Sequence, residues 1–78
     1  MVTIYISMNK VNEIFAERLI DLRKEHKLSI KELARQIGVS DVAIGRWEKK
    51  LQTPNILMLD LIAKYFKVTP NYLLGYEN

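Results

Sequence analysis

Most of the chain carries its hydrophobic residues at the spacing of an α-helix. Apolar side chains three or four positions apart predict a first helix that ends near His26. The side chains that recur at this spacing are Val11, Ile14, Phe15, Leu19 and Leu22. Four shorter helices are expected after it, at about residues 29–38, 40–49, 55–67 and 69–75. The predicted fold class is therefore all-α, with five helices in one compact domain.

Residues 1–8 follow a different pattern, in which apolar and polar side chains alternate. Val2, Ile4 and Ile6 share one face, and period two with β-branched residues predicts a short strand. A lone strand cannot satisfy its own backbone hydrogen bonds, so it must pair with another chain, lie along the helices or stay disordered. We therefore divide the chain into an N-terminal extension at residues 1–10, a candidate strand or dimer arm, and a helical domain at residues 11–78.

The most informative segment covers residues 29–49, which carry helix-capping signals. Ser29 and Glu32 form a capping-box pattern, Gly38 can end a helix at positive φ, and Ser40 is a good N-cap. Two short helices joined by so tight a turn predict either a helix-turn-helix motif or an ordinary helical hairpin with a solvated polar face, and these residues alone do not decide between them. A helix of this kind fits the major groove of DNA and reads base edges near its N-terminal half. The residues expected on the outward side of its second helix are Asp41, Val42, Gly45, Arg46 and Lys49.

Composition narrows the function classes. A net charge of +3 and a pI near 9.3 permit nucleic-acid binding, which many basic domains nevertheless lack. With no cysteine and only one histidine, His26, we expect no metal, no cofactor and no enzymatic activity. No apolar run approaches the roughly 20 residues that span a bilayer, and no signal-peptide pattern begins the chain. We expect a protein of a reducing cytoplasm, without membrane contact.

A specific combination of motifs covers residues 14–75: "LSIKELARQIGVS", then "WE", a proline before the fourth helix, and "NYLLG". This combination resembles the Cro and phage-repressor type (xenobiotic-response-element type) of helix-turn-helix regulators. The resemblance implies a compact five-helix domain, usually dimeric on double-stranded DNA, that regulates transcription. It also implies a prokaryotic or phage protein that is associated with the nucleoid. No small-molecule ligand is expected. The sequence departs from the family at Lys49 and Lys50, where Asn-Gly is usual, and at Ile30, where a phosphate-binding Gln is frequent. It also departs at Asp41, where a basic or amide side chain is frequent and a carboxylate would repel phosphates.

Position by position, the resemblance assigns DNA contacts to the predicted motif. Arg46 is the principal candidate for base recognition, because a guanidinium can donate two hydrogen bonds to guanine O6 and N7. The alternative is that Arg46 is solvated or faces Glu48. The residues that match the base readers of the family are Asp41, Val42, Gly45 and Arg46. The candidate phosphate contacts are Ser29, Lys31, Arg35, Ser40, Lys49 and Lys50.

The fourth predicted helix has two apolar faces. The face expected in the core consists of Ile56, Leu59, Ile62, Ala63 and Phe66. The second face consists of Leu57, Met58, Leu61 and Tyr65. An additional apolar face in so small a domain predicts a dimer or partner surface. The alternative is that residues 2–6 of the extension pack back over it.

These patterns favour a sequence-specific repressor that binds a near-palindromic operator as a homodimer. The alternative is a protein-interaction module, such as an antitoxin or anti-repressor, that keeps the fold but acts through a protein partner. Ile30, Asp41 and the second face of the fourth helix favour this alternative, whereas Arg46 and the basic loop after it favour DNA.

Overall fold

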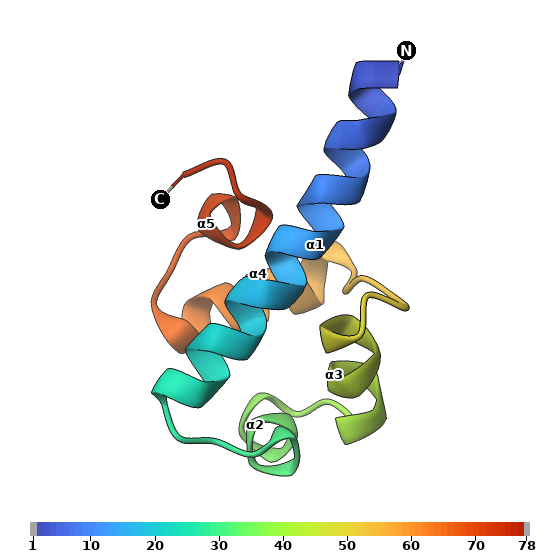
Figure 1. The fold of residues 1–78 in the computed structure, drawn as a ribbon. Helices are drawn as coiled ribbons and strands as arrows, with labels where there is room; N and C mark the ends of the chain where they lie inside the picture. Colours follow the sequence, from blue (N-terminus) through green and yellow to red (C-terminus); the bar gives the residue numbers. More distant parts are fainter. Residues whose placement is uncertain (1, 78) are drawn as a thin grey trace.

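The computed structural model describes residues 2–77 of the chain, and it describes side chains from residue 10 onward. It is built from helices connected by short loops (Figure 1). In chain order these are α1 (Val2–Glu25), α2 (Ile30–Ile37), α3 (Asp41–Glu48), α4 (Ile56–Phe66) and α5 (Pro70–Leu74). The predicted all-α fold with five helices is confirmed for the described residues.

The strand predicted at the N-terminus is wrong. Residues 2–9 form the first turns of α1, a helix of 24 residues that runs without a break through residue 10. A strand in an otherwise helical chain finds no partner for its backbone, whereas each residue added to an existing helix gains a hydrogen bond within the same segment. The idea that the side chains of residues 2–6 cover α4 lies outside the described residues.

Short side chains cap the start of each of the four later helices, as the sequence predicts. In each case the side-chain oxygen accepts a hydrogen bond from the backbone N–H three residues later, at 2.9–3.1 Å. The caps are Ser29, Ser40, Asn55 and Thr69. At α2 the capping box is complete, because the Ser29 N–H donates to Glu32 at 2.8 Å and lowers the pKa of that carboxyl group.

One hydrophobic core joins all the helices. Every helix contributes at least one fully buried large side chain: Phe15 and Leu19 from α1, Leu33 from α2, Ile44 from α3, Ile62 from α4 and Leu73 from α5. The long α1 crosses the other helices and packs against α3 and α5, while α2 packs against α3 and α4 (Figure 1). The helix-turn-helix therefore rests on the rest of the domain through α1 and α4.

The two faces predicted for α4 are only partly correct. Ile56 was expected in the core, but its side chain is 82% exposed because α4 begins at this residue and the core begins about one turn later. On the second face, Met58 and Tyr65 pack against the core, whereas Leu57 is 74% and Leu61 37% exposed. The exposed apolar surface of α4 is therefore centred on its first turns.

Candidate nucleic-acid interface

A tight turn sets the angle between α2 and α3. Gly38 takes the left-handed conformation, with φ of 77°, and its N–H donates to the Ala34 carbonyl at 2.9 Å. The Val39 N–H donates to the same carbonyl at 3.0 Å, so the chain leaves α2 at once. Ser40 then starts α3. The inner sides of both helices belong to one buried cluster, which leaves the outer side of α3 free for contacts.

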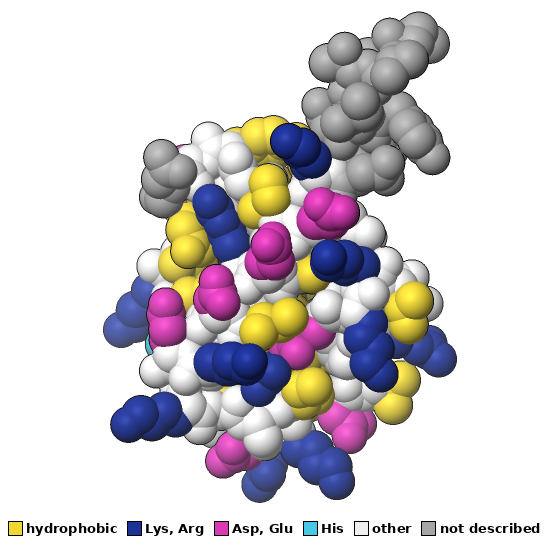
Figure 2. All heavy atoms as spheres, in the orientation of Figure 1, with side chains coloured by type: hydrophobic (Ala, Val, Ile, Leu, Met, Phe, Trp, Pro, Cys, Tyr) yellow, Lys and Arg dark blue, Asp and Glu magenta, His cyan; other side chains and the backbone are white. Residues whose placement is uncertain are grey.

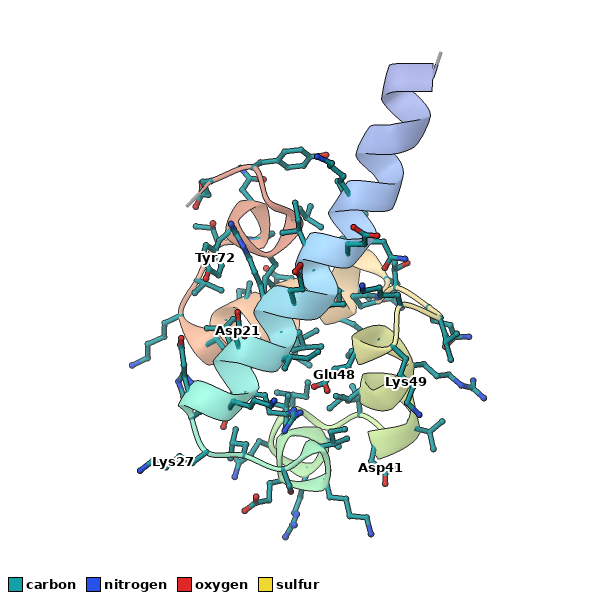
Figure 3. All side chains as sticks on the ribbon, viewed as in Figure 1. Asp21, Lys27, Asp41, Glu48, Lys49 and Tyr72 are labelled. Atoms are coloured by element: carbon teal, nitrogen blue, oxygen red, sulfur yellow. The ribbon has the colours of Figure 1, made fainter. Side chains whose placement is uncertain are left out.

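The outer side of α3 forms one wall of a shallow hollow of about 500 Å³. The hollow is lined by the start of α2, by α3 and by the loop that follows it, and its residues are Ile30, Lys31, Asp41, Val42, Gly45, Arg46, Lys49 and Leu51. Asp41 and Lys49 point away from the helical body (Figure 3). Three of the lining side chains are cationic and one is anionic, so the hollow suits a negatively charged partner.

The hollow brings together six of the ten residues predicted to contact DNA. All four candidate base readers line it, as do Lys31 and Lys49. The other four candidate phosphate contacts lie outside its lining and are exposed: Ser29, Arg35, Ser40 and Lys50. Ser29 and Ser40 already accept backbone hydrogen bonds as caps, but each hydroxyl keeps its proton for a further acceptor.

Two lining residues, Ile30 and Leu51, were not predicted as site residues. Ile30 is partly buried against the core, whereas Leu51 is 69% exposed. A signal for Leu51 exists in the sequence, because it is an isolated apolar residue directly after two lysines in the loop that leaves α3.

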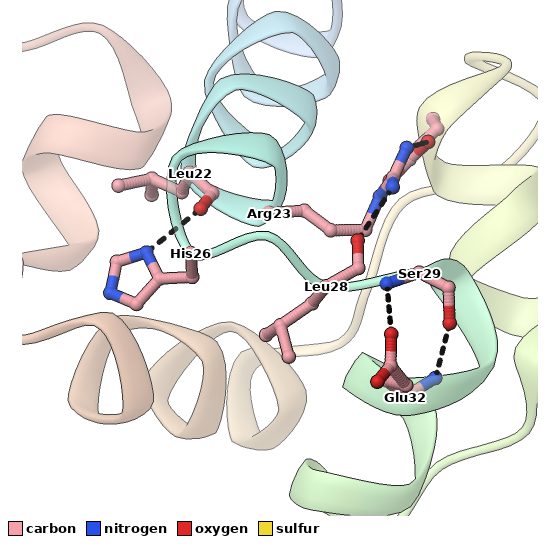
Figure 4. Close-up of polar contacts among 7 residues, drawn as sticks. Leu22, Arg23, His26, Leu28, Ser29 and Glu32 are labelled. Atoms are coloured by element: carbon pink, nitrogen blue, oxygen red, sulfur yellow. Dashed lines mark hydrogen bonds and ion pairs between the residues drawn. The ribbon is translucent and has the colours of Figure 1, made fainter.

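An ion pair anchors the C-terminal end of α3 to α1. The Arg23 guanidinium donates to both Glu48 oxygens, at 2.7 and 3.0 Å, and to the Leu28 carbonyl at 2.9 Å. The two side chains are only 14% and 9% exposed, and the hydrogen bonds to Glu48 raise the pKa of Arg23. Figure 4 shows Arg23 between the Leu28 loop and α3. Because Glu48 binds Arg23, it is not the partner of Arg46.

Acidic side chains form a row along the exposed side of α1. Exposed carboxylates recur every four residues along α1, at Glu13, Glu17, Asp21 and Glu25. Figure 2 shows acidic side chains following α1 across this face, with lysine and arginine side chains around them and toward the lower edge. Like charges would repel a polyanion from the exposed side of α1, so electrostatics favours an approach by the helix-turn-helix.

Comparison with known proteins identifies the family. The family model described as "Helix-turn-helix" matches residues 19–73, which include α2, α3 and α4. The chain belongs to this family of DNA-binding transcriptional regulators, of the Cro and phage-repressor type, and not to a family of enzymes.

Three curated relatives carry the same domain within longer chains. They are the HTH-type transcriptional regulator YobD of Bacillus subtilis (34% identical over 62 residues), the HTH-type transcriptional activator BcrR of Enterococcus faecalis (41% over 63) and the repressor protein C2 of Salmonella phage P22 (36% over 62). The matches cover 80%, 81% and 80% of this chain, but 55%, 31% and 29% of the relatives. The chain thus spans about half the length of YobD and less than a third of the other two.

A solved structure supports the same assignment. The P22 c2 repressor, crystallised in complex with the synthetic operator 9T, superimposes with a TM-score of 0.75 at 35% identity. The superposition covers 81% of this chain and 96% of the repressor chain. In the described part of the chain, no helix is long and apolar enough to cross a membrane, and no three acidic or histidine side chains are grouped as metal ligands.

Proposed function

We propose that this chain is a sequence-specific repressor that inserts α3 into the major groove of a near-palindromic operator. The observation that carries the proposal is the hollow on the outer side of α3, where all four candidate base readers lie among Lys31 and Lys49. The similarity to a repressor whose structure was determined with operator DNA supports it. Repression follows if the bound domain excludes other proteins from the operator.

Each lining residue has a distinct role in this proposal. Arg46 donates to guanine O6 and N7, Val42 contacts a thymine methyl group, and Asp41 accepts from cytosine N4. Gly45 contributes no side chain and lets the backbone of α3 approach the bases. The phosphate contacts are assigned to Ser29, Lys31, Arg35, Ser40, Lys49 and Lys50, which fix the register of α3 without reading sequence.

We further propose that two copies bind together. Their contact would use the exposed apolar residues at the start of α4, chiefly Leu57 and Leu61, with Met58 and Tyr65 beneath them. A two-fold symmetric pair would place the two α3 helices about one turn of DNA apart, roughly 34 Å. A protein partner on the same surface is the second candidate function, favoured by the exposure of Leu57.

In-vitro selection from a random duplex pool at near-physiological salt tests the proposal. We expect enrichment of a two-fold symmetric motif with half-sites about 10 base pairs apart, because each copy reads one half-site. A non-symmetric motif would retain the DNA reader but contradict the homodimer. A pool without enrichment, bound only at low salt, would contradict the repressor and favour the protein-binding alternative on α4.

Replacement of Gly45 by alanine is expected to separate stability from DNA binding. A Cβ at this position meets nothing within 4 Å, and alanine is the better helix former, so the free energy of unfolding should rise by about 0.5–1 kcal/mol. The added methyl group projects into the hollow, so operator affinity should fall by about 1 kcal/mol or more. Thermal unfolding and fluorescence anisotropy measure the two effects.

The matched control for Gly45→Ala is Glu17→Ala, on the exposed side of α1. It also places alanine at an exposed helix position, but away from the hollow, and should not lower operator affinity. If Gly45→Ala binds operator as tightly as the original protein, the backbone of α3 does not approach the base edges closely.

A further inference from the structure

The loop after α3 holds Leu51 beside the backbone of Arg46. The Leu51 N–H donates to the Arg46 carbonyl at 2.9 Å, and the Lys50 N–H donates to the Trp47 carbonyl at 3.2 Å. Lys50 takes the left-handed conformation, with φ of 65°. These two hydrogen bonds around a left-handed residue define a Schellman motif, in which Leu51 and Arg46 occupy the positions that usually make a hydrophobic contact.

The usual apolar partner of Leu51 is missing from this motif. In its place stands Arg46, and the Leu51 side chain is left 69% exposed. Both residues line the same hollow, where Val42, 57% exposed, adds a second apolar side chain. The hollow thus presents exposed hydrocarbon among the cations Lys31, Arg46 and Lys49.

The chemistry of the hollow limits its occupant. A polyanion satisfies the cations, and its surface must also offer an apolar group within reach of Leu51. Of the groups that distinguish the base pairs in the major groove, the C5-methyl of thymine is the apolar one, and the others in that code are hydrogen-bond donors and acceptors. A phosphate-only contact would leave Leu51 against water.

We propose that Leu51 is a specificity-determining residue that contacts the methyl group of a thymine adjacent to the base bound by Arg46. This inference rests on the proposed DNA-binding function and extends sequence reading from α3 to the loop after it. The Schellman motif fixes the backbone at Arg46 and Leu51, and both side chains line one hollow, so we expect the thymine and the guanine at adjacent positions in each half-site.

Thymine-to-uracil substitution tests this proposal, because uracil lacks only the methyl group. Each thymine of the selected operator is replaced in turn in fluorescein-labelled duplexes, and binding is measured by anisotropy. One thymine per half-site, next to the guanine read by Arg46, should lose about fourfold in affinity on replacement, the equivalent of about 0.8 kcal/mol for one buried methyl. In Leu51→Ala, the same replacement should have no effect.

Val42→Ala is the matched control, since it shortens the other exposed apolar side chain of the hollow. It should keep the uracil penalty at the Leu51 position and lose a penalty elsewhere. A Leu51→Ala protein that retains every uracil penalty, or an operator without a thymine beside that guanine, would overturn the assignment. Either result would leave sequence-specific binding intact, whereas failure to select any operator would contradict the proposed function itself.

Discussion

Replacement of Arg23 by alanine is expected to lower the free energy of unfolding by about 2–4 kcal/mol. The substitution leaves the Glu48 carboxylate, only 9% exposed, without its two hydrogen bonds, and it frees the Leu28 carbonyl as well. Removing one partner of a mostly buried ion pair is costly because the remaining charge stays away from water. Urea unfolding followed by the fluorescence of the buried Trp47 measures the change.

Two further variants distinguish the loss of the ion pair from a general effect of substitutions in α1 on stability. Lys24→Ala removes the neighbouring, exposed cation and should change the free energy of unfolding by less than about 0.5 kcal/mol. Arg23→Met combined with Glu48→Leu removes both charges and should recover most of the loss, since no uncompensated carboxylate remains. A loss of less than about 0.5 kcal/mol in Arg23→Ala would mean that the pair does not anchor α3.

The Arg23–Glu48 ion pair matters because it holds the C-terminal end of α3. Glu48 is the last residue of α3, and Lys49, Lys50 and Leu51 follow directly. Asn12 of α1 also donates to the Lys50 carbonyl, at 3.5 Å. The ion pair therefore ties the end of α3 to α1, with the longer Asn12 contact two residues further on, and a reading helix must hold its side chains in a fixed register against the bases.

Local signals explain why much of the helix-turn-helix could be predicted from sequence. A cap such as Ser29 and a left-handed glycine such as Gly38 act within four or five residues, so the sequence contains the whole interaction. The prediction of a strand at residues 2–8 was wrong because alternating apolar and polar side chains do not show whether a partner strand exists. The prediction that Ile56 is buried was wrong because the helical spacing of apolar residues continues past the point where the core ends.

Local sequence signals could not predict the contacts between segments that are distant in the chain. Arg23 and Glu48 lie 25 positions apart, and nothing in either neighbourhood indicates the other. The hollow likewise joins Ile30, before the turn, to Leu51, after α3, and only the fold brings them to one surface. The outward residues of α3 could be predicted because they share one helix, whereas the place of Ile30 and Leu51 beside them could not.

Replacement of Arg46 by alanine is expected to reduce affinity for the selected operator by about 1–3 kcal/mol and to relax the preference at one base pair per half-site. Arg46 is exposed and lines the hollow, and Glu48, the carboxylate two positions away, is bound to Arg23. Its guanidinium is therefore available for two hydrogen bonds to guanine. Affinities for the operator and for all three substitutions at each position, measured at one salt concentration, give the change.

Arg35 provides the matched control, because it is an exposed arginine of the same motif that does not line the hollow. Arg35→Ala should weaken binding to every sequence alike and reduce the slope of log K against log salt by about 0.9, as expected for one phosphate contact. Lys50→Ala should behave in the same way.

Arg46→Lys decides whether the contribution of Arg46 is charge or geometry. Lysine keeps the positive charge but is a point charge that lacks the planar fork of the guanidinium, so operator preference should stay relaxed, as in Arg46→Ala, while the salt dependence should match that of the original protein. If Arg46→Ala and Arg35→Ala instead weaken operator and random DNA equally, Arg46 binds phosphate. Base recognition would then have to come from Asp41, Val42 and Leu51. Their carboxylate and two apolar side chains have no hydrogen-bond donor for guanine.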